Sequence, residues 1–120
     1  MLSNTLCVIE KMIKQLNSDL DATPIVEFFR NYKKGMWIYP GVLKRKFSLD
    51  MNQVYELLSS IEREGILQSY YELYCGNCQK SMGTVELFNQ LPDYFECEIC
   101  GEELPTLENS VIIYKVIRDE

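Results

Sequence analysis

Apolar residues recur at helical spacing over residues 1–20. Spacings of three and four residues separate the members of this seam, which are Leu2, Leu6, Ile9, Ile13, Leu16 and Leu20. This period places them on one side of a helix, expected from about residue 3 to residue 19. The seam can pack on the chain's own domain or form an interface with a protein partner or a second copy. Cys7 lies on the same face and is expected to be an inert core residue.

The next segment contains two short helical patterns separated by an extended one. Thr23 followed by Pro24 indicates a helix start, because a capping hydroxyl before proline suits the first helical position. Gly35 indicates the end of that helix. A short strand is expected at residues 36–38 and a second short helix at residues 41–47.

The helix after residue 50 is the most clearly specified element. Asp50 can cap it, and Gln53 stands where a capping box requires a glutamine or a glutamate. Gly65 indicates its end. A β-strand is expected at residues 66–74, running directly into a cysteine. The order helix, strand, helix, turn, helix, strand is typical of a winged helix, a variant of the helix-turn-helix.

Two CxxC pairs follow, separated by eighteen residues, in a chain without histidine. Their members are Cys75, Cys78, Cys97 and Cys100. This spacing is typical of a structural zinc ribbon, in which thiolates from two tight turns fill the tetrahedral ligand set of one Zn²⁺. Gly101 suits the turn after the second pair, whereas Gln79 in the equivalent place predicts a slightly different first turn. Two disulfides are the alternative, which the absence of a secretory leader disfavours.

Strand patterns accompany the cysteines. Residues 84–88 and 94–96 are expected to be strands joined by a turn that contains Pro92. Residues 110–118 predict a final strand that is apolar on both faces and should pair with the strand at 66–74 or with a partner. We find no membrane-spanning stretch, leader or lipidation signal, and therefore expect a cytoplasmic or nuclear protein with no membrane partner.

These patterns together predict an α+β protein, a winged helix-turn-helix with an N-terminal amphipathic helix, followed by a small β zinc ribbon. The expected boundaries give the amphipathic helix residues 1–20, the winged helix 21–74, the C4 zinc ribbon 75–107 and the C-terminal strand 108–120. One structural Zn²⁺ is the expected cofactor, because the ribbon segment has too few large aliphatic residues to fold without metal.

Charge is unevenly distributed along the chain. The net charge is −6, but residues 1–47 carry +4 and residues 48–120 carry −10. No acidic residue occurs from Arg30 to Phe47, and this stretch is the candidate site for phosphates. The candidate nucleic-acid-binding residues are Lys33, Lys34, Lys44, Arg45 and Lys46 for the backbone, with Asn52 and Gln53 for bases. The same basic residues could instead form a solvated face or meet an acidic protein.

The inventory of side chains disfavours catalysis. The chain has no histidine, no glycine-rich phosphate loop and no nucleophile elbow. A metal held by four cysteines has no open position for a water or a substrate. We therefore expect a non-enzymatic protein with no catalytic residues and no small-molecule substrate.

A winged helix whose last strand leads into CGNC and, after eighteen residues, CEICG resembles two related transcription factors. They are the transcription factor IIE alpha subunit and archaeal transcription factor E, and the similarity is to their N-terminal half. It covers about residues 23–104 and includes the acidic and apolar run at 85–88. The resemblance implies that the winged helix contacts a polymerase and promoter DNA and that neither part is an enzyme.

The leading hypothesis is a non-enzymatic, transcription-associated module whose winged helix contacts the DNA backbone and whose zinc ribbon docks a protein. A polymerase-type subunit, a subunit of another complex or a second copy is the expected protein partner, and duplex DNA is a candidate ligand. One alternative is a structural adaptor that binds only protein. Another is an acidic inhibitor that competes with DNA for a nucleic-acid enzyme through residues 48–120.

Overall fold

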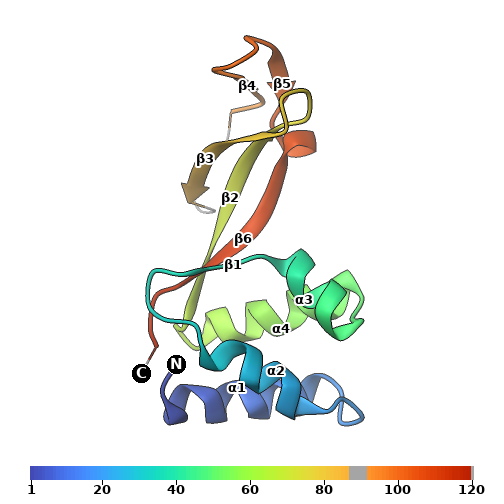
Figure 1. Cartoon of the computed structure of the whole chain (residues 1–120), viewed down its shortest axis with the longest axis vertical. Coiled ribbons are helices and arrows are strands. Elements are labelled where there is room, and N and C mark those ends of the chain that lie inside the picture. The colour runs from blue at the N-terminus through green and yellow to red at the C-terminus, as the bar shows by residue number, and fades with distance from the viewer. Residues whose placement is uncertain (87–91, 120) are drawn as a thin grey trace. The chain divides into compact units, whose positions relative to one another are not determined.

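The computed structural model describes residues 1–86 and 92–119 (Figure 1). The chain divides into two compact units. Met1–Gln68 and Tyr114–Glu120 form one, here called the helical unit, and Ser69–Ile113 form the other, here called the ribbon unit. The described residues contain α-helices and antiparallel strands, which confirms the predicted α+β class.

Four α-helices occur among the described residues of the helical unit: α1 (Ser3–Leu16), α2 (Ala22–Arg30), α3 (Pro40–Phe47) and α4 (Met51–Arg63). Helix α1 packs against α2 and α4, and α3 packs against α4 (Figure 1). The largest fully buried side chains of these helices form the core: Ile9, Ile13, Phe29, Leu43, Val54, Leu57, Leu58 and Ile61. Burial of this continuous aliphatic surface is the main force that holds the helices together.

The predicted capping box begins α4. Gln53 donates its backbone N–H to the Asp50 carboxylate at 2.8 Å, and the Gln53 side-chain oxygen accepts the Asp50 N–H at 3.3 Å. These two bonds satisfy N–H groups that a helix start leaves without partners. Helix α2 begins slightly earlier than Thr23 and Pro24 suggest, because Asp21 is the N-cap and accepts the Thr23 N–H at 3.1 Å.

Helix α1 ends at Leu16, before the expected residue 19. Asn17 is extended, and its side-chain oxygen accepts the backbone N–H of Asp19 at 2.9 Å, which turns the chain out of the helix. Cys7 is exposed, so its predicted place in the core is wrong. The buried face of α1 is formed by Thr5, Leu6, Ile9 and Ile13.

The larger sheet has the strand order β1-β6-β2-β3. Its strands are β1 (Trp37–Ile38), β2 (Leu67–Cys75), β3 (Lys80–Glu86) and β6 (Ser110–Val116). Within the helical unit, the antiparallel pairing of β1 with β6 sets Ile38 opposite Tyr114. The order places β6 beside β2, which confirms the expected pairing of the last strand with the strand before the first cysteine pair.

The ribbon unit contains the β2–β3 hairpin and a second, smaller pair of strands. These are β4 (Tyr94–Glu96) and β5 (Glu103–Pro105), which pair in antiparallel fashion. A 3-10 turn, η1 (Leu107–Asn109), then leads into β6. The predicted strand at 84–88 corresponds to the end of β3, and its last two positions lie outside the described residues.

None of the helices in the described part of the chain combines the length and the apolar character required to span a bilayer.

Candidate metal centre

The first cysteine pair lies in a turn between β2 and β3. Cys75 ends β2, and its carbonyl accepts the backbone N–H of Gln79 at 2.8 Å. Its sulfur accepts the backbone N–H of Cys78 at 3.4 Å. Gln79 has a φ of 55°, in the left-handed region, and this conformation closes the turn. The turn therefore directs both sulfurs to the same side.

The second pair repeats this geometry in a turn between β4 and β5. The carbonyl of Cys97 accepts the backbone N–H of Gly101 at 2.9 Å, and its sulfur accepts those of Ile99 and Cys100 at 3.4 Å each. Gly101 has a φ of 71°, which glycine adopts without steric cost. Gln79 has a left-handed φ, as Gly101 does, so both turns close in the same way although their residues differ.

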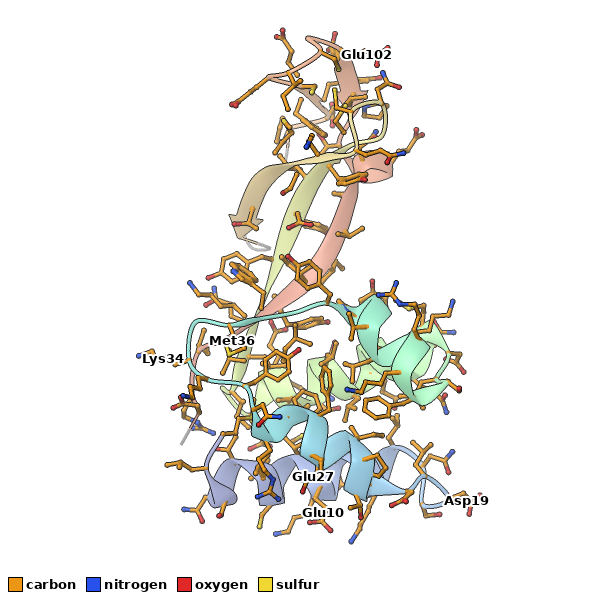
Figure 2. All side chains as sticks on the ribbon, in the orientation of Figure 1. Glu10, Asp19, Glu27, Lys34, Met36 and Glu102 are labelled. Atoms are coloured by element: carbon orange, nitrogen blue, oxygen red, sulfur yellow. The ribbon has the colours of Figure 1, made fainter. Side chains whose placement is uncertain are left out.

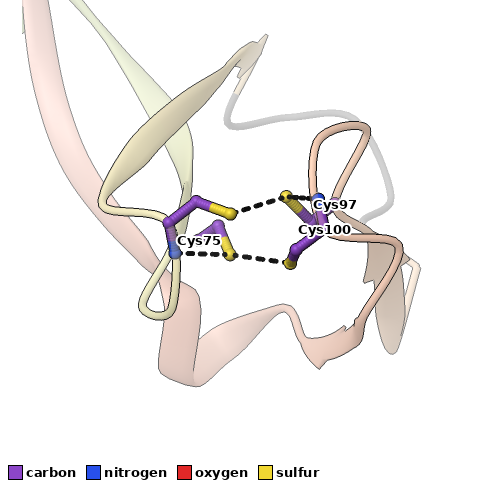
Figure 3. A group of neighbouring side chains, drawn as sticks. Cys75, Cys97 and Cys100 are labelled. Carbon is purple, nitrogen blue, oxygen red and sulfur yellow. Dashed lines mark hydrogen bonds between the residues drawn. The ribbon is translucent and has the colours of Figure 1, made fainter.

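The two turns bring all four sulfurs of Cys75, Cys78, Cys97 and Cys100 within 4.8 Å of one another (Figure 3). Two cross pairs, Cys75 with Cys100 and Cys78 with Cys97, have Sγ–Sγ distances of 3.8 Å. Sulfurs placed about 2.3 Å from a common centre at the corners of a tetrahedron are about 3.8 Å apart. The four cysteines are free thiols, not disulfides, and their spacing fits one metal ion.

The surroundings of the thiols favour loss of protons at one position and retention at another. Backbone N–H groups, that of Cys100 first, hold the pKa of the Cys97 thiol at about 7 by stabilising its thiolate. Hydrogen bonding to the Cys100 thiol, followed by burial, raises the pKa of Cys78 to about 12. A metal ion replaces the protons of such thiols when it binds.

A small apolar cluster surrounds the sulfurs. Cys75, Cys97 and Leu104 are buried, and Met82 and Phe95 pack against them. Leu104 lies opposite Phe95 in the β4–β5 pair, so the missed strand β5 supplies an aliphatic side chain to this cluster. Water therefore has restricted access to Cys75 and Cys97, whereas Cys100 is exposed.

The predicted backbone-binding residues all lie on the surface of the helical unit. Lys33 and Lys34 are exposed in the segment between α2 and β1, and Lys34 extends away from it (Figure 2). Lys44, Arg45 and Lys46 are exposed in the last turn of α3. The ammonium of Lys46 lies 5.2 Å from the centre of the Phe28 ring, in a cation–π contact.

The two predicted base-reading residues differ in their surroundings. Asn52 is exposed in the first turn of α4. Gln53 is partly buried, and its side chain already accepts a hydrogen bond from Asp50. A base contact by Gln53 would have to compete with the capping box.

The predicted partner seam is divided by the fold. Leu6, Ile9 and Ile13 are buried in the core of the helical unit, with at most 6% of their surface exposed. Leu16 and Leu20 are partly buried, and Leu2 is 62% exposed. The middle of the seam is therefore used within the chain, and its ends remain the predicted contact for a partner.

Comparisons with protein-family models, with curated proteins and with solved structures found no match. The assignment of the cysteine cluster therefore depends on its own geometry. Four free thiols whose sulfurs lie within 4.8 Å of one another form a candidate site for one metal ion.

Proposed function

We propose that the chain is a non-enzymatic binding module in which one structural Zn²⁺ holds the ribbon unit together. The helical unit contacts the backbone of duplex DNA, and the ribbon unit docks a protein. The observation that carries the zinc assignment is the set of four converging thiols. The observation that carries the DNA assignment is the exposed basic turn at the end of α3.

Zinc fits the cysteine cluster better than the other common divalent ions. Thiolates are soft ligands, and a tetrahedral set of four sulfurs is typical of zinc and of iron–sulfur sites. Cys75, Cys78, Cys97 and Cys100 would fill all four positions of the ion. The ion would then supply fold stability, because no position remains for a reacting water or substrate.

The helical unit is proposed to be a winged helix. In support, α3 and α4 are joined by a short turn in which Ser48 has a φ of 55°, and the two helices pack on each other. The ends of β2 and β6 that belong to the helical unit would begin the wing beside β1, and the ribbon unit is inserted between these two ends in the sequence. In a helix-turn-helix the first helix crosses the DNA backbone, which would be the role of α3 with Lys44 and Arg45.

The ribbon unit is proposed to bind protein, not DNA. Residues 69–113 contain eight acidic residues and one lysine, a net charge of −7, and a Zn²⁺ held by four thiolates would add −2. A polyanion would be repelled by such a surface. The resemblance to the transcription factor IIE alpha subunit and archaeal transcription factor E supports a role in transcription.

Fluorescence anisotropy of labelled duplex DNA across a salt series tests the DNA proposal. The substitutions Lys44→Gln and Arg45→Gln, made together, are expected to lower the slope of log K against log salt by up to about 2, since each phosphate that is no longer neutralised lowers it by about 0.9. Lys11→Gln with Lys14→Gln is a matched control, since it removes two exposed lysines from α1 and should leave the slope unchanged.

This experiment distinguishes the proposed module from an adaptor that binds only protein. The negative charge of the ribbon unit is compatible with that adaptor as well. If zinc-loaded protein does not bind duplex DNA at low salt, the DNA assignment is wrong. If both double variants reduce the slope equally, the contact is a general charge effect and not a site on α3. Competition with DNA for a nucleic-acid enzyme without DNA binding would favour the acidic inhibitor.

A further inference from the structure

A groove on the helical unit lies between α2 and the end of α3, and Lys46 is the one predicted backbone-binding residue among those that line it. It encloses about 570 Å³, within the range of ligand-binding clefts. The lining residues come from α2, the segment after it and α3, and they are Pro24, Glu27, Phe28, Asn31, Tyr32, Met36, Lys46 and Phe47. Four of these eight side chains are large and apolar or aromatic, so the groove is suited to an apolar group.

The floor of the groove is a cluster of aromatic rings. Phe28 lies at its centre, with ring centroids 5.1 Å from Tyr32 and 5.7 Å from Phe47. All three side chains are partly buried, and their contacts with one another fix them in place. Met36, at the rim, is 44% exposed, and its sulfur accepts the backbone N–H of Lys33 at 3.3 Å. The sequence contains these aromatic residues, but their spacing indicates only a helix face, and the groove depends on α3 meeting α2.

The charge around the groove is positive. Lys46 places its ammonium over the Phe28 ring, at 5.2 Å from the ring centre. Glu27 is the one acidic lining residue, and it forms an ion pair with Arg30 at 2.9 Å. Residues 31–47 add further basic residues and no acidic one. A ligand with negative charges beside its apolar group would therefore be complementary to this surface.

We propose that this groove is a docking site for an acidic segment of a partner protein that inserts one large apolar side chain among Phe28, Met36 and Phe47. Stacking of a nucleic-acid base is disfavoured, because such stacking requires an open ring face. Phe28 and Phe47 meet edge to face at 88°, and Lys46 covers a face of Phe28. The site goes beyond the proposed DNA contact, since Lys44 and Arg45 do not line it.

The test uses a fluorescein-labelled peptide in which one phenylalanine is flanked by glutamates, titrated with zinc-loaded protein. Met36→Glu is expected to weaken binding about tenfold, because it places a negative charge at the rim of the groove. The matched control is Val111→Glu, which introduces the same charge at an exposed apolar residue of β6 that does not line the groove and should leave affinity unchanged. Lys46→Glu provides a second variant at an exposed position if Met36→Glu disturbs the fold.

Two further probes give the test its specificity. A peptide with serine in place of the phenylalanine should bind at least about tenfold more weakly, because it lacks the apolar anchor. Binding of the original peptide should survive the Lys44→Gln and Arg45→Gln pair. That result would show that peptide binding does not depend on the proposed DNA contact. The peptide proposal and the DNA proposal can therefore be tested separately.

Three results would overturn the proposal. The first is equal binding of the phenylalanine and serine peptides, or no binding of either, in titrations followed by amide chemical shifts. The second is binding of single-stranded oligothymidylate that Met36→Glu abolishes, which would assign the groove to nucleic acid. The third is concentration-dependent self-association that Met36→Glu abolishes, measured by sedimentation, which would assign the groove to a second copy.

Discussion

The helical unit and the ribbon unit bury very different interiors. In the helical unit, large aliphatic and aromatic side chains from all four helices and from the strands are fully buried. In the ribbon unit, the cluster around the metal site contains two buried cysteines and Leu104, with Cys78, Met82 and Phe95 partly buried against them. The interior of the helical unit is therefore made of aliphatic and aromatic side chains, whereas the described cluster in the ribbon unit is made largely of cysteine thiols.

This difference implies two sources of stability. Each fully buried aliphatic side chain contributes about 1.5–3 kcal/mol, and the helical unit has many of them. Among the described residues of the ribbon unit, the buried aliphatic side chains are Leu104 and Ile113, which are far from enough to offset the ordering of its backbone. Binding of Zn²⁺ to a structural site contributes about 10–16 kcal/mol at neutral pH, and it can supply what the ribbon lacks.

Removal of the metal is expected to have the largest effect. Chelation should unfold the ribbon unit and leave the helices folded, because only the ribbon depends on the four thiols. Circular dichroism should keep its helical signal, while amide resonances of residues 69–113 collapse to the range of unfolded chains. The effect should be reversed by added Zn²⁺.

A substitution at one ligand gives the same test without a chelator. Cys97→Ser should abolish stoichiometric zinc binding, whereas Cys7→Ser should leave it intact because Cys7 belongs to α1 and is not one of the four clustered thiols. Retention of a folded ribbon after complete metal removal would contradict the view that its core is insufficient. Loss of the helices together with the ribbon would mean that the two units do not fold separately.

The converse test removes a large side chain from the core of the helical unit and leaves the metal site unchanged. Phe29 is fully buried, and Phe29→Ala should lower the free energy of unfolding of the helices by about 3–5 kcal/mol. The measurement is urea unfolding followed by circular dichroism. Leu2→Ala, at a residue that is 62% exposed, should change it by less than about 0.5 kcal/mol. If Phe29→Ala also lowered the affinity for zinc, the two units would not be stabilised independently of each other.

The elements best predicted from the sequence are those specified by neighbouring residues. Asp50 and Gln53 satisfy each other's backbone groups, so α4 could be located before any tertiary contact was known. The cysteine cluster could likewise be predicted, because two CxxC turns each fix a pair of sulfurs locally and only their meeting requires the fold.

The elements that were missed depend on contacts distant in sequence or on local competition. Strand β5 contains a proline and an acidic residue, and it exists because it pairs with β4, with Cys97 donating its N–H to the Glu102 carbonyl at 2.9 Å. The early end of α1 comes from the Asn17 side chain, which competes with the helix for a backbone N–H. The groove beside Phe28 arises where two helices meet, and no single segment encodes it.

The smallest expected effects concern the two turns of the metal site, which share one backbone conformation but not one residue type. An added Cβ at Gly101 would meet no atom closer than 3.9 Å, so Gly101→Ala should cost about 1 kcal/mol through its left-handed φ alone. Gln79→Gly should stabilise the ribbon unit by about 0.5 kcal/mol. Glycine removes the strain of a left-handed φ, and this gain should exceed the loss that comes from a more flexible unfolded chain.

Competition with a zinc chelator measures both changes, because folding of the ribbon is linked to its metal. Gly101→Ala should weaken zinc affinity about fivefold and Gln79→Gly should strengthen it about twofold. Urea unfolding of the helices is the control and should be unaffected, since both residues belong to the ribbon unit. If Gln79→Gly instead weakened zinc binding, the Gln79 side chain would contribute to the stability of the first turn. The two turns would then be stabilised in different ways.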